Sequence, residues 1–377
     1  MTDVSPVITG LDSDDAGVRV SLADRPDPLV LPWFWIRDHS DDPSALDVAT
    51  HQRAVDTFTI DRSRTGTATV TDGVLRVTWP DDTPTSVITP STLAAAVPTE
   101  AVAAGPAEDR PLELWRDPAD VHLTDLDHEQ VMAGGDGLRA WMHDIATFGV
   151  GVVRGVPTGD EAAEALANRI GYVRRSVFGD VWRLSAEAMA FADSSYGAET
   201  LLPHTDGCYS HDGPGLQFFV CAERTGTGGE STAVDAFAAA EALRAADPEA
   251  FDLLAEVAVP HRYLDDGIHL EARRPTLRLD DRGELVQVTL NNYDRAPFLL
   301  DEGRLQPWYD AYAAYHELVN DRACWWSTRL EPGDALVVDN WRCLHGRLAF
   351  TGTRVFYGGY LNHEDFESRL RVLDQAA

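Results

Sequence analysis

The sequence predicts a mainly β protein with helices, in which a small β-rich N-terminal domain precedes a larger domain of the β-sandwich or jelly-roll type. Three observations lead to this fold class. The chain has 377 residues, which is room for about two domains and a large core. Short runs of β-branched and aromatic residues, separated by Asp, Pro and Gly turns, recur along it, whereas helical patterns are few. Many strands with few helices are typical of sandwiches and jelly rolls.

The N-terminal domain is expected over residues 1–97. Its predicted strands are the apolar runs at 17–22, 29–38 and 74–82. Residues 98–122 carry several prolines together with small and acidic residues, a composition typical of a linker. The larger domain is therefore expected over residues 123–377.

In the larger domain, a helix is predicted over 136–148 and strands follow it. The helix shows apolar residues at i, i+3, i+4 and i+7, namely Leu138, Trp141, Met142 and Ile145, and Gly149 can end it. A buried strand is expected at 149–155, and Thr158 with Glu161 matches a capping box for a helix over 161–173. Further strands are predicted at 215–221, 284–292, 334–340 and 354–361, with helices near 236–256 and 305–319.

Composition narrows the function classes. The net charge is −31 and every basic residue is an arginine, so nucleic acid is not an expected partner. No apolar run approaches the ~20 residues of a membrane span, and the acidic N-terminus resembles no secretory or mitochondrial leader. Together with four scattered cysteines, this predicts a cytoplasmic location. The acidic, lysine-free composition fits either a high-salt habitat or a GC-rich genome.

A candidate metal site begins in the stretch 201–211, LLPHTDGCYSH. On its own this stretch could be a polar turn after a strand. However, His204 and Asp206 are two residues apart, so they share one side of a strand, and His345 follows another apolar strand far downstream. Two histidines and one carboxylate form the facial triad that holds Fe(II) and leaves three positions open. The same ligand set would also suit zinc or manganese.

Arg354 adds a second requirement of the same chemistry. A guanidinium can clamp the far carboxylate of a bidentate cosubstrate, and the order H-x-D, then His, then Arg is the order that a 2-oxoglutarate oxygenase requires. Taken singly, His345 could be an ordinary strand-end histidine and Arg354 a surface ion-pair partner. The occurrence of all four residues in this order favours a site for metal and cosubstrate over these separate explanations.

Several segments carry a resemblance to a known family. The chain resembles the γ-butyrobetaine/trimethyllysine dioxygenase family over nearly its whole length, and it is more similar to the trimethyllysine enzymes. The segments are WIRDHS, THQRAVDT, GPGLQFFVC, GTGGESTAVDAF, LNNYDRA and VVDNWRCLHGRLAFTGTRVFYGGYL. The resemblance implies a double-stranded β-helix (jelly-roll) catalytic domain, Fe(II), 2-oxoglutarate as cosubstrate, O2, stimulation by ascorbate, and a homodimer.

The resemblance also implies roles for individual residues. His204, Asp206 and His345 would be the iron ligands, Arg354 would bind the far carboxylate of 2-oxoglutarate, and Ser231 would offer it a hydroxyl. A trimethylammonium group cannot donate a hydrogen bond, so aromatic faces must recognise it. The residues that match the family's cage and substrate positions are Phe178, Trp182, Tyr196, Tyr360, Asp193 and Asn292. From spacing alone, Trp182 and Tyr196 could equally be core aromatics, and Asp193 a turn residue.

The chain departs from the family at its structural zinc site. Ser40, Asp42 and Ala45 stand where relatives carry cysteines, and Thr83 stands where they carry a histidine. These residues cannot build a four-ligand thiolate site, so no structural zinc is expected. The small domain would then depend on packing, with Trp33, Phe34, Trp35 and Trp79 as candidates.

The function expected from these residues is Fe(II)- and 2-oxoglutarate-dependent hydroxylation of a small quaternary-ammonium molecule, first of all trimethyllysine, as in carnitine biosynthesis. Asp193 supports that choice, because an acid can meet the α-ammonium of trimethyllysine, whereas the γ-butyrobetaine enzymes carry an asparagine that faces a carboxylate. Hydroxylation of γ-butyrobetaine, or oxidation of a related betaine or trimethylaminoethylphosphonate, remains open. From other classes, so do a jelly-roll metal hydrolase and a binding module without catalysis.

Overall fold

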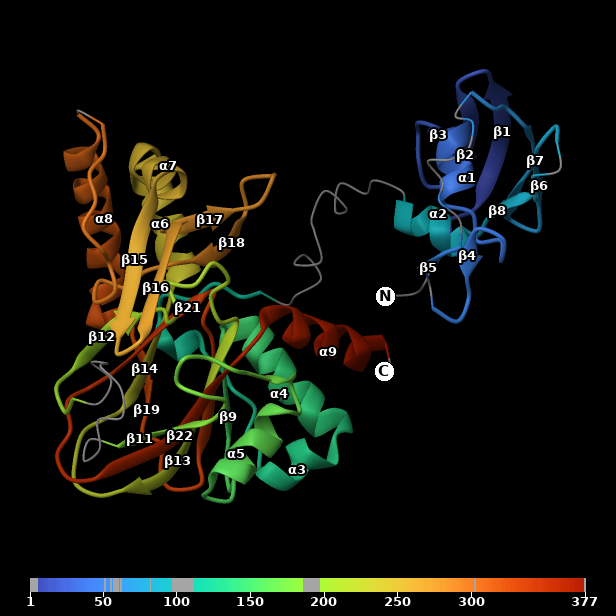
Figure 1. The fold of residues 1–377 in the computed structure, drawn as a ribbon. Helices are drawn as coiled ribbons and strands as arrows, with labels where there is room; N and C mark the ends of the chain where they lie inside the picture. The colour runs from blue at the N-terminus through green and yellow to red at the C-terminus, as the bar shows by residue number, and fades with distance from the viewer. Residues whose placement is uncertain are drawn as a thin grey trace. The chain divides into compact units, whose positions relative to one another are not determined.

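The chain forms two compact units, Met1–Glu108 and Asp109–Ala377 (Figure 1). The computed structural model describes residues 6–50, 52–54, 56, 61, 63–81, 83–96, 112–185, 197–301 and 303–375. No helix among these residues is long and apolar enough to cross a bilayer.

The first unit contains two three-stranded antiparallel sheets. Their strands are β1 (Ile8–Asp14), β2 (Gly17–Leu22) and β3 (Leu29–Pro32), and β6 (Thr67–Thr71), β7 (Val74–Thr78) and β8 (Ser86–Ile88). A short pair, β4 (Leu46–Asp47) with β5 (Gln52–Arg53), and two helices, α1 (Trp33–Asp38) and α2 (Pro90–Ala96), complete it. The alternating apolar residues of β2 and β7 meet in one core, in which Val18, Val20, Leu75 and Val77 are fully buried.

The apolar composition of the run 29–38 predicts a single strand, but the structure divides this run into a strand and a helix. The strand ends at Pro32, which has no N–H to donate, and the helix α1 begins at Trp33. Trp33 and Ile36 are three residues apart, so the helix buries both side chains in the core of this unit.

Two of the positions at which the resemblance implies zinc ligands, Ser40 and Thr83, take part in hydrogen bonds within the protein. Ser40 Oγ accepts the N–H of Val87 at 2.9 Å, and Thr83 Oγ1 accepts from Arg64 at 2.7 Å. Trp33 packs edge-on against Trp79, with ring centroids 6.2 Å apart. These contacts are of the kind that a domain held by packing needs, and the absence of structural zinc stays a prediction.

The second unit is a sandwich of two antiparallel sheets, as the sequence predicts for the larger domain. The larger sheet has the order β10 (Val173–Arg174), β22 (Arg354–Leu361), β13 (Leu216–Arg224), β20 (Ala335–Asp339) and β9 (Val150–Val153), with β11 (Trp182–Ser185) also paired to β22. The smaller sheet has the order β12 (Leu201–His204), β21 (Cys343–Arg347), β14 (Ser231–Asp235) and β19 (Trp326–Thr328). Side chains of both sheets, including Leu336, Phe356 and Ala233, fill the space between them.

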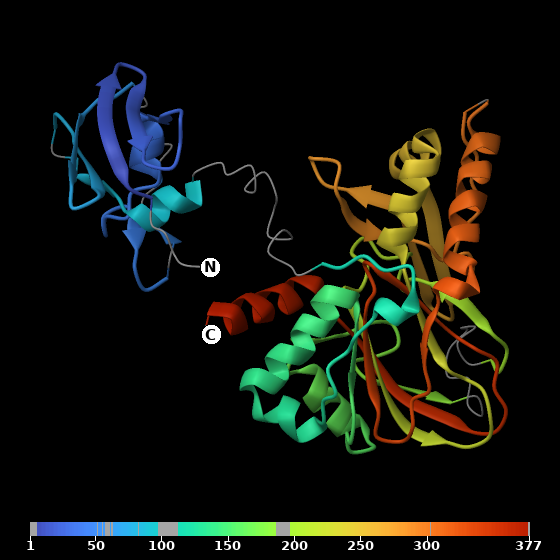
Figure 2. The same ribbon diagram turned by 180° about the vertical axis from the view of Figure 1, so that it is seen from behind.

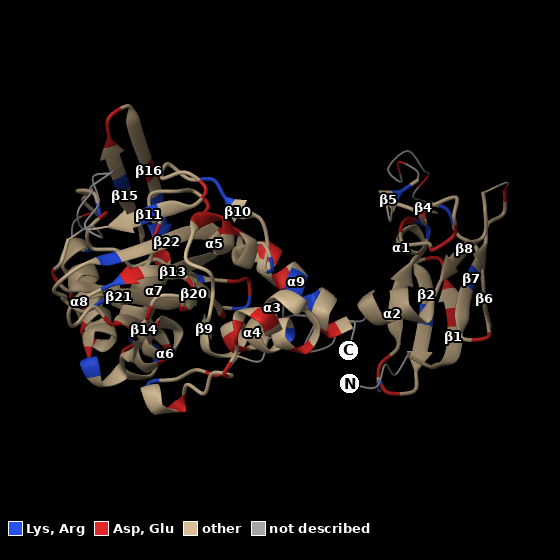
Figure 3. Ribbon diagram, turned by 90° about the horizontal axis from the view of Figure 1, so that it is seen from below, with Lys and Arg blue, Asp and Glu red and all other residues tan. Residues whose placement is uncertain are grey.

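Helices cover the sandwich on two sides (Figures 1 and 2). On the outer face of the larger sheet lie α3 (His128–Ala133), α4 (Gly135–Phe148), α5 (Asp160–Ala167) and α9 (His363–Gln375). A second core joins α6 (Ala236–Ala246), α7 (Pro248–Glu256) and α8 (Leu305–Asn320) to the strands β17 (Leu277–Leu279) and β18 (Leu285–Val288), beside the hairpin β15 (Ala258–Asp265) and β16 (Ile268–Pro275). Figure 3 shows acidic residues on α3, α4 and α9.

The two predictions made for the first helices of the second unit have different outcomes. The helix predicted over 136–148 is confirmed as α4, and Gly149 ends it in the left-handed region with φ 76°. The capping box is wrong, because the residue before α5 is Gly159 and no side chain caps this helix.

The second part of the predicted linker packs onto the second unit. Trp115 is 2% exposed, and its indole N–H donates to the carbonyl of Phe148 at 2.9 Å. The guanidinium of Arg342 reaches the carbonyl of Glu113 and also the buried carboxylate of Asp235, 2.7 Å away. Residues 112–122 therefore belong to the sandwich unit, because a buried tryptophan and the hydrogen bond from Arg342 to the Glu113 carbonyl hold their N-terminal part. Residues 98–111 lie outside the described residues.

Candidate active site

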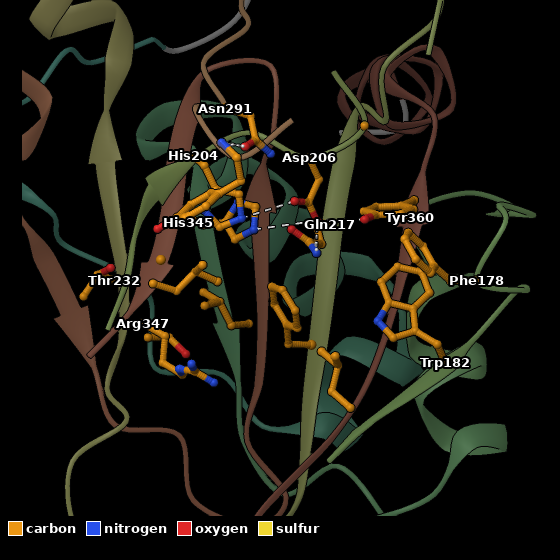
Figure 4. A pocket seen from close by; sticks show the side chains of 18 of the residues that line it. Phe178, Trp182, His204, Asp206, Gln217, Thr232, Asn291, His345, Arg347 and Tyr360 are labelled. Atoms are coloured by element: carbon orange, nitrogen blue, oxygen red, sulfur yellow. Dashed lines mark hydrogen bonds and ion pairs between the residues drawn. The ribbon is translucent and has the colours of Figure 1, made fainter. Parts of the chain in front are cut away.

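The two predicted histidine ligands lie on neighbouring strands of the smaller sheet. Strands β12 and β21 pair so that His204 stands directly opposite His345, and Asp206 follows β12 in the next turn. The Nε2 atom of His204 lies 3.3 Å from Asp206 Oδ1, and that of His345 lies 3.8 Å from Asp206 Oδ2. One ligand atom from each residue fits within 4.8 Å of the others, and these are the only three such residues in the described part of the chain (Figure 4).

The orientation and surroundings of the three side chains suit a divalent metal. His204 Nδ1 donates to the carbonyl of Leu202 at 2.8 Å, and its Nε2 atom is the nitrogen that faces Asp206. Burial, with His204 beside it, lowers the pKa of His345 to about 4. Burial alone would raise the pKa of Asp206, but the two histidines hold it below its ordinary value. Two imidazoles and one carboxylate fit Fe(II), and they would also hold zinc or manganese.

Arg354 lies in the same pocket without a carboxylate partner among the described residues. Its guanidinium stacks 3.9 Å from the centroid of the Phe356 ring, and its Nε is buried without a hydrogen-bond partner. Burial, with Arg347 and Arg224 nearby, lowers its pKa to about 9, which still leaves it a cation at neutral pH. A desolvated cation that opens onto a pocket favours an anionic ligand there. Ser231 lines the same pocket.

Three of the predicted cage aromatics come together on the opposite side of the pocket from Arg347 (Figure 4). The ring centroids of Phe178 and Trp182 are 5.9 Å apart, and those of Trp182 and Tyr360 are 4.5 Å apart. Strand β11 pairs with β22 so that Trp182 stands opposite Gly358, where a Cβ would come within 3.3 Å of the indole nitrogen. We call Phe178, Trp182 and Tyr360 the aromatic wall. Tyr196 and Asp193 lie outside the described residues.

Similarity to known proteins identifies the family of this chain. Residues 108–360 match the model of the family described as taurine catabolism dioxygenase TauD, TfdA family. The chain belongs to this dioxygenase family.

Two kinds of relatives are similar in sequence to this TauD/TfdA dioxygenase over most of its length. It is 31% identical to the mitochondrial trimethyllysine dioxygenase of Rattus norvegicus, over 90% of this chain and 82% of the relative. It is 36% identical to the gamma-butyrobetaine dioxygenase of Pseudomonas sp. strain AK-1, over 81% of this chain and 79% of that one. The family resemblance seen in the sequence is thereby confirmed. A putative alpha-ketoglutarate-dependent taurine dioxygenase from Burkholderia xenovorans aligns with a TM-score of 0.46 at 18% identity, over 64% of this chain and 87% of that one.

The structure does not bring Asn292, a predicted substrate contact, to the pocket. Asn292 is exposed, its side chain accepts from Arg295 at 3.0 Å, and it does not line the pocket. Its neighbour Asn291 is 4% exposed, lines the pocket and donates to the carbonyl of Thr205 at 3.2 Å. Thr205 stands between two predicted metal ligands, so Asn291 is the asparagine beside the site.

Two further residues, Arg347 and Gln217, line the pocket in addition to those that the sequence predicts. Arg347 follows His345 by two residues in β21, so both side chains point to the same face, and the alternation of a strand could have revealed it. The Arg347 guanidinium donates to the carbonyls of Gly197 and Glu199, both at 2.8 Å. Gln217, on β13, donates to Asp206, and no sequence pattern distinguishes it from other residues of an apolar strand.

Proposed function

We propose that this protein is an Fe(II)- and 2-oxoglutarate-dependent dioxygenase that hydroxylates a small trimethylammonium compound, with trimethyllysine as the preferred substrate. One observation supports this most: a single pocket contains a three-ligand metal site, a buried arginine without a described carboxylate partner, and the aromatic wall. The metal ligands and the arginine fit a keto-diacid, and the wall fits a cation that cannot form hydrogen bonds.

Each group of the chain has a separate task in this reaction. Fe(II), held by His204, Asp206 and His345, would supply the activation of O2 and the oxidation of the substrate. Arg354 would neutralise and orient the far carboxylate of 2-oxoglutarate with its planar fork, and Ser231, which lines the same pocket, would offer it a hydroxyl. The aromatic wall would offer its ring faces to the trimethylammonium group and exclude water from it. Binding both molecules in one pocket fixes their orientation, which is the main contribution of the protein to the rate.

The choice between substrates depends on Asp193, which the resemblance places at the amino-acid end. An ionised carboxylate there would form a charge-assisted hydrogen bond with the α-ammonium of trimethyllysine, worth roughly 1.5–3 kcal/mol, or roughly 10- to 150-fold in binding. γ-Butyrobetaine presents only a carboxylate at that end, which Asp193 would repel. It is the second candidate, because the Pseudomonas relative with 36% identity is a gamma-butyrobetaine dioxygenase.

A turnover screen tests the proposal. Trimethyllysine, γ-butyrobetaine and trimethylaminoethylphosphonate are each incubated with Fe(II), 2-oxoglutarate, O2 and the protein, with and without ascorbate, and hydroxylated product and succinate are measured. Trimethyllysine should give the highest kcat/KM. Asp193→Asn should lower the turnover of trimethyllysine and spare that of γ-butyrobetaine, whereas Trp182→Leu should lower both. An unchanged preference in Asp193→Asn would remove the physical support for trimethyllysine.

Location and assembly are part of the same proposal. We infer a cytoplasmic enzyme, because all four cysteines are unpaired and buried, as in proteins of reducing compartments. The resemblance supports a homodimer. Light scattering of the purified protein at several concentrations measures its mass, and a monomer at micromolar concentration would contradict the dimer.

A further inference from the structure

The two oxygens of the Asp206 carboxylate have different surroundings. Oδ2 accepts two hydrogen bonds, one from Gln217 Nε2 and one from the hydroxyl of Tyr360, both at 2.7 Å (Figure 4). Oδ1 lies 3.3 Å from the Nε2 atom of His204. A carboxylate oxygen has about two acceptor positions, so the two donors use those of Oδ2. Oδ1 is then the oxygen left for a metal ion.

The two donors stand side by side on the larger sheet, opposite the strands that carry the histidines. Strands β13 and β22 pair so that Gln217 and Tyr360 are directly opposite each other, and both side chains therefore point to the same face. They are 3% and 4% exposed. One sheet thus supplies the two histidines, and the other supplies the groups that hold the carboxylate.

A glutamine at position 217 is less favourable for folding than an apolar residue, and its hydrogen bond to Asp206 explains why it is there. Its Oε1 is buried and has no hydrogen-bond partner among the described residues. An apolar residue of similar size would avoid that cost, since an unpaired buried polar atom is unfavourable. Its Nε2 has the bond to Asp206. The amide is therefore best explained by what it does for the carboxylate.

The backbone of Asp206 is fixed as well. The side chain of Asn340 accepts the N–H of Asp206 at 2.8 Å and donates to its carbonyl at 3.1 Å. Asp206 is therefore held at the backbone by one residue and at the side chain by two others. Rotation of the carboxylate that brought Oδ2 toward a metal would break two charge-assisted hydrogen bonds.

We propose that Gln217 and Tyr360 are positioning residues that make Asp206 a one-oxygen ligand. A carboxylate that bound through both oxygens would fill one of the three positions that a facial triad leaves open, and a bidentate cosubstrate with O2 needs all three. Tyr360 also belongs to the aromatic wall, so its hydroxyl serves the metal ligand while its ring faces the substrate cation. This second part rests on the proposed function; the first part does not.

The metal arm of the test uses the complete, metal-free protein and Mn(II) alone. Gln217→Met keeps the length of the side chain without the amide, and Tyr360→Phe keeps the ring without the hydroxyl. Each should weaken Mn(II) binding about 10- to 100-fold in calorimetry, the usual effect of removing a partner of a metal ligand. Tyr357→Phe is the matched control, because Tyr357 lies on the same strand and packs on the opposite, helix-covered face. It should leave the affinity unchanged, and the circular dichroism spectra of all three metal-free variants should match that of the wild type.

A spectroscopic readout separates positioning from a general loss of structure. At saturating Fe(II) without O2, a 2-oxoglutarate that chelates the metal through two oxygens gives a visible charge-transfer absorption band. The wild type and Tyr357→Phe should show the full band. Gln217→Met and Tyr360→Phe should show a weaker one, since Oδ2 then competes for a position.

The cation arm measures trimethyllysine binding to the metal-free protein. Tyr360→Phe should bind it within about twofold of the wild type, whereas Phe178→Leu should lose about 2- to 30-fold. Phe178→Leu should in turn leave Mn(II) affinity unchanged. Wild-type Mn(II) affinity and a full absorption band in both Gln217→Met and Tyr360→Phe would overturn the positioning role. If the wild type binds no trimethyllysine, the cation part and the proposed substrate fail, while the Mn(II) data still decide the role of Gln217 and Tyr360.

Discussion

Replacing Arg354 by methionine should weaken cosubstrate binding without weakening the fold. Methionine keeps an apolar side chain of similar length and removes the guanidinium that stacks on the Phe356 ring. The lost charge-assisted hydrogen bonds to 2-oxoglutarate are worth about 1.5–3 kcal/mol, which raises the dissociation constant about 10- to 150-fold. Arg354→Lys should recover part of the loss, because an ammonium keeps the charge without the planar fork.

The same substitution, Arg354→Met, should not lower the stability of the metal-free protein. Burial lowers the pKa of Arg354 to about 9, which means that the folded protein pays to keep this cation out of water. Its removal should leave the melting temperature equal or higher. Calorimetric titration of 2-oxoglutarate into the Mn(II)-loaded protein, with thermal melts of the metal-free protein, measures both effects. Arg371→Met changes the net charge equally at an exposed position and should change neither quantity. Unaltered 2-oxoglutarate affinity in Arg354→Met would remove this residue from the cosubstrate site.

Two further predictions concern stability. Burial lowers the pKa of His261 from 6.5 to about 4, so the unfolded chain takes up a proton first and stability falls as the pH drops from about 6.5 to about 4, by about 3 kcal/mol in all. Urea unfolding of His261→Gln at pH 7.5 and pH 5 should show a smaller fall than the wild type, and an equal fall would contradict the assignment. Asp235→Ala should cost about 3–5 kcal/mol, because it leaves the buried Arg342 cation without its partner 2.7 Å away. Asp235→Ala with Arg342→Met should cost less than the sum of the single changes, and strict additivity in denaturant unfolding would show that the pair is not coupled.

The sequence predicts those helices and strands that show a regular spacing of apolar residues or form a single apolar run. Helix α4 is found because its apolar residues recur every three or four positions and a glycine ends it. Strands β13, β20 and β22 are found because they are buried apolar runs between turns. The run 29–38 misleads, because its aromatic residues suit a buried helix as well as a strand, and only Pro32 marks the change.

What the sequence does not show is which side chain meets which across the sandwich. Trp115 lies in a segment rich in prolines and acids, and nothing local shows that a tryptophan there is buried beside Phe148. Asn291 and Asn292 are adjacent, so a shift of one residue decides which of them faces the pocket. Gln217 acquires its role only because β13 pairs with β22 in a particular register. The metal ligands are easier to find, since their residue types and order carry the chemistry themselves.

The formation of succinate tests the central claim most directly. The wild-type protein, supplied with Fe(II), O2, 2-oxoglutarate and trimethyllysine, should form succinate and hydroxylated product in equal amounts. His345→Ala should form neither while keeping its fold by circular dichroism, since two remaining ligands hold the metal weakly. Succinate that requires no metal, full activity of His345→Ala, or product that forms by hydrolysis without 2-oxoglutarate would contradict a dioxygenase built on His204, Asp206 and His345.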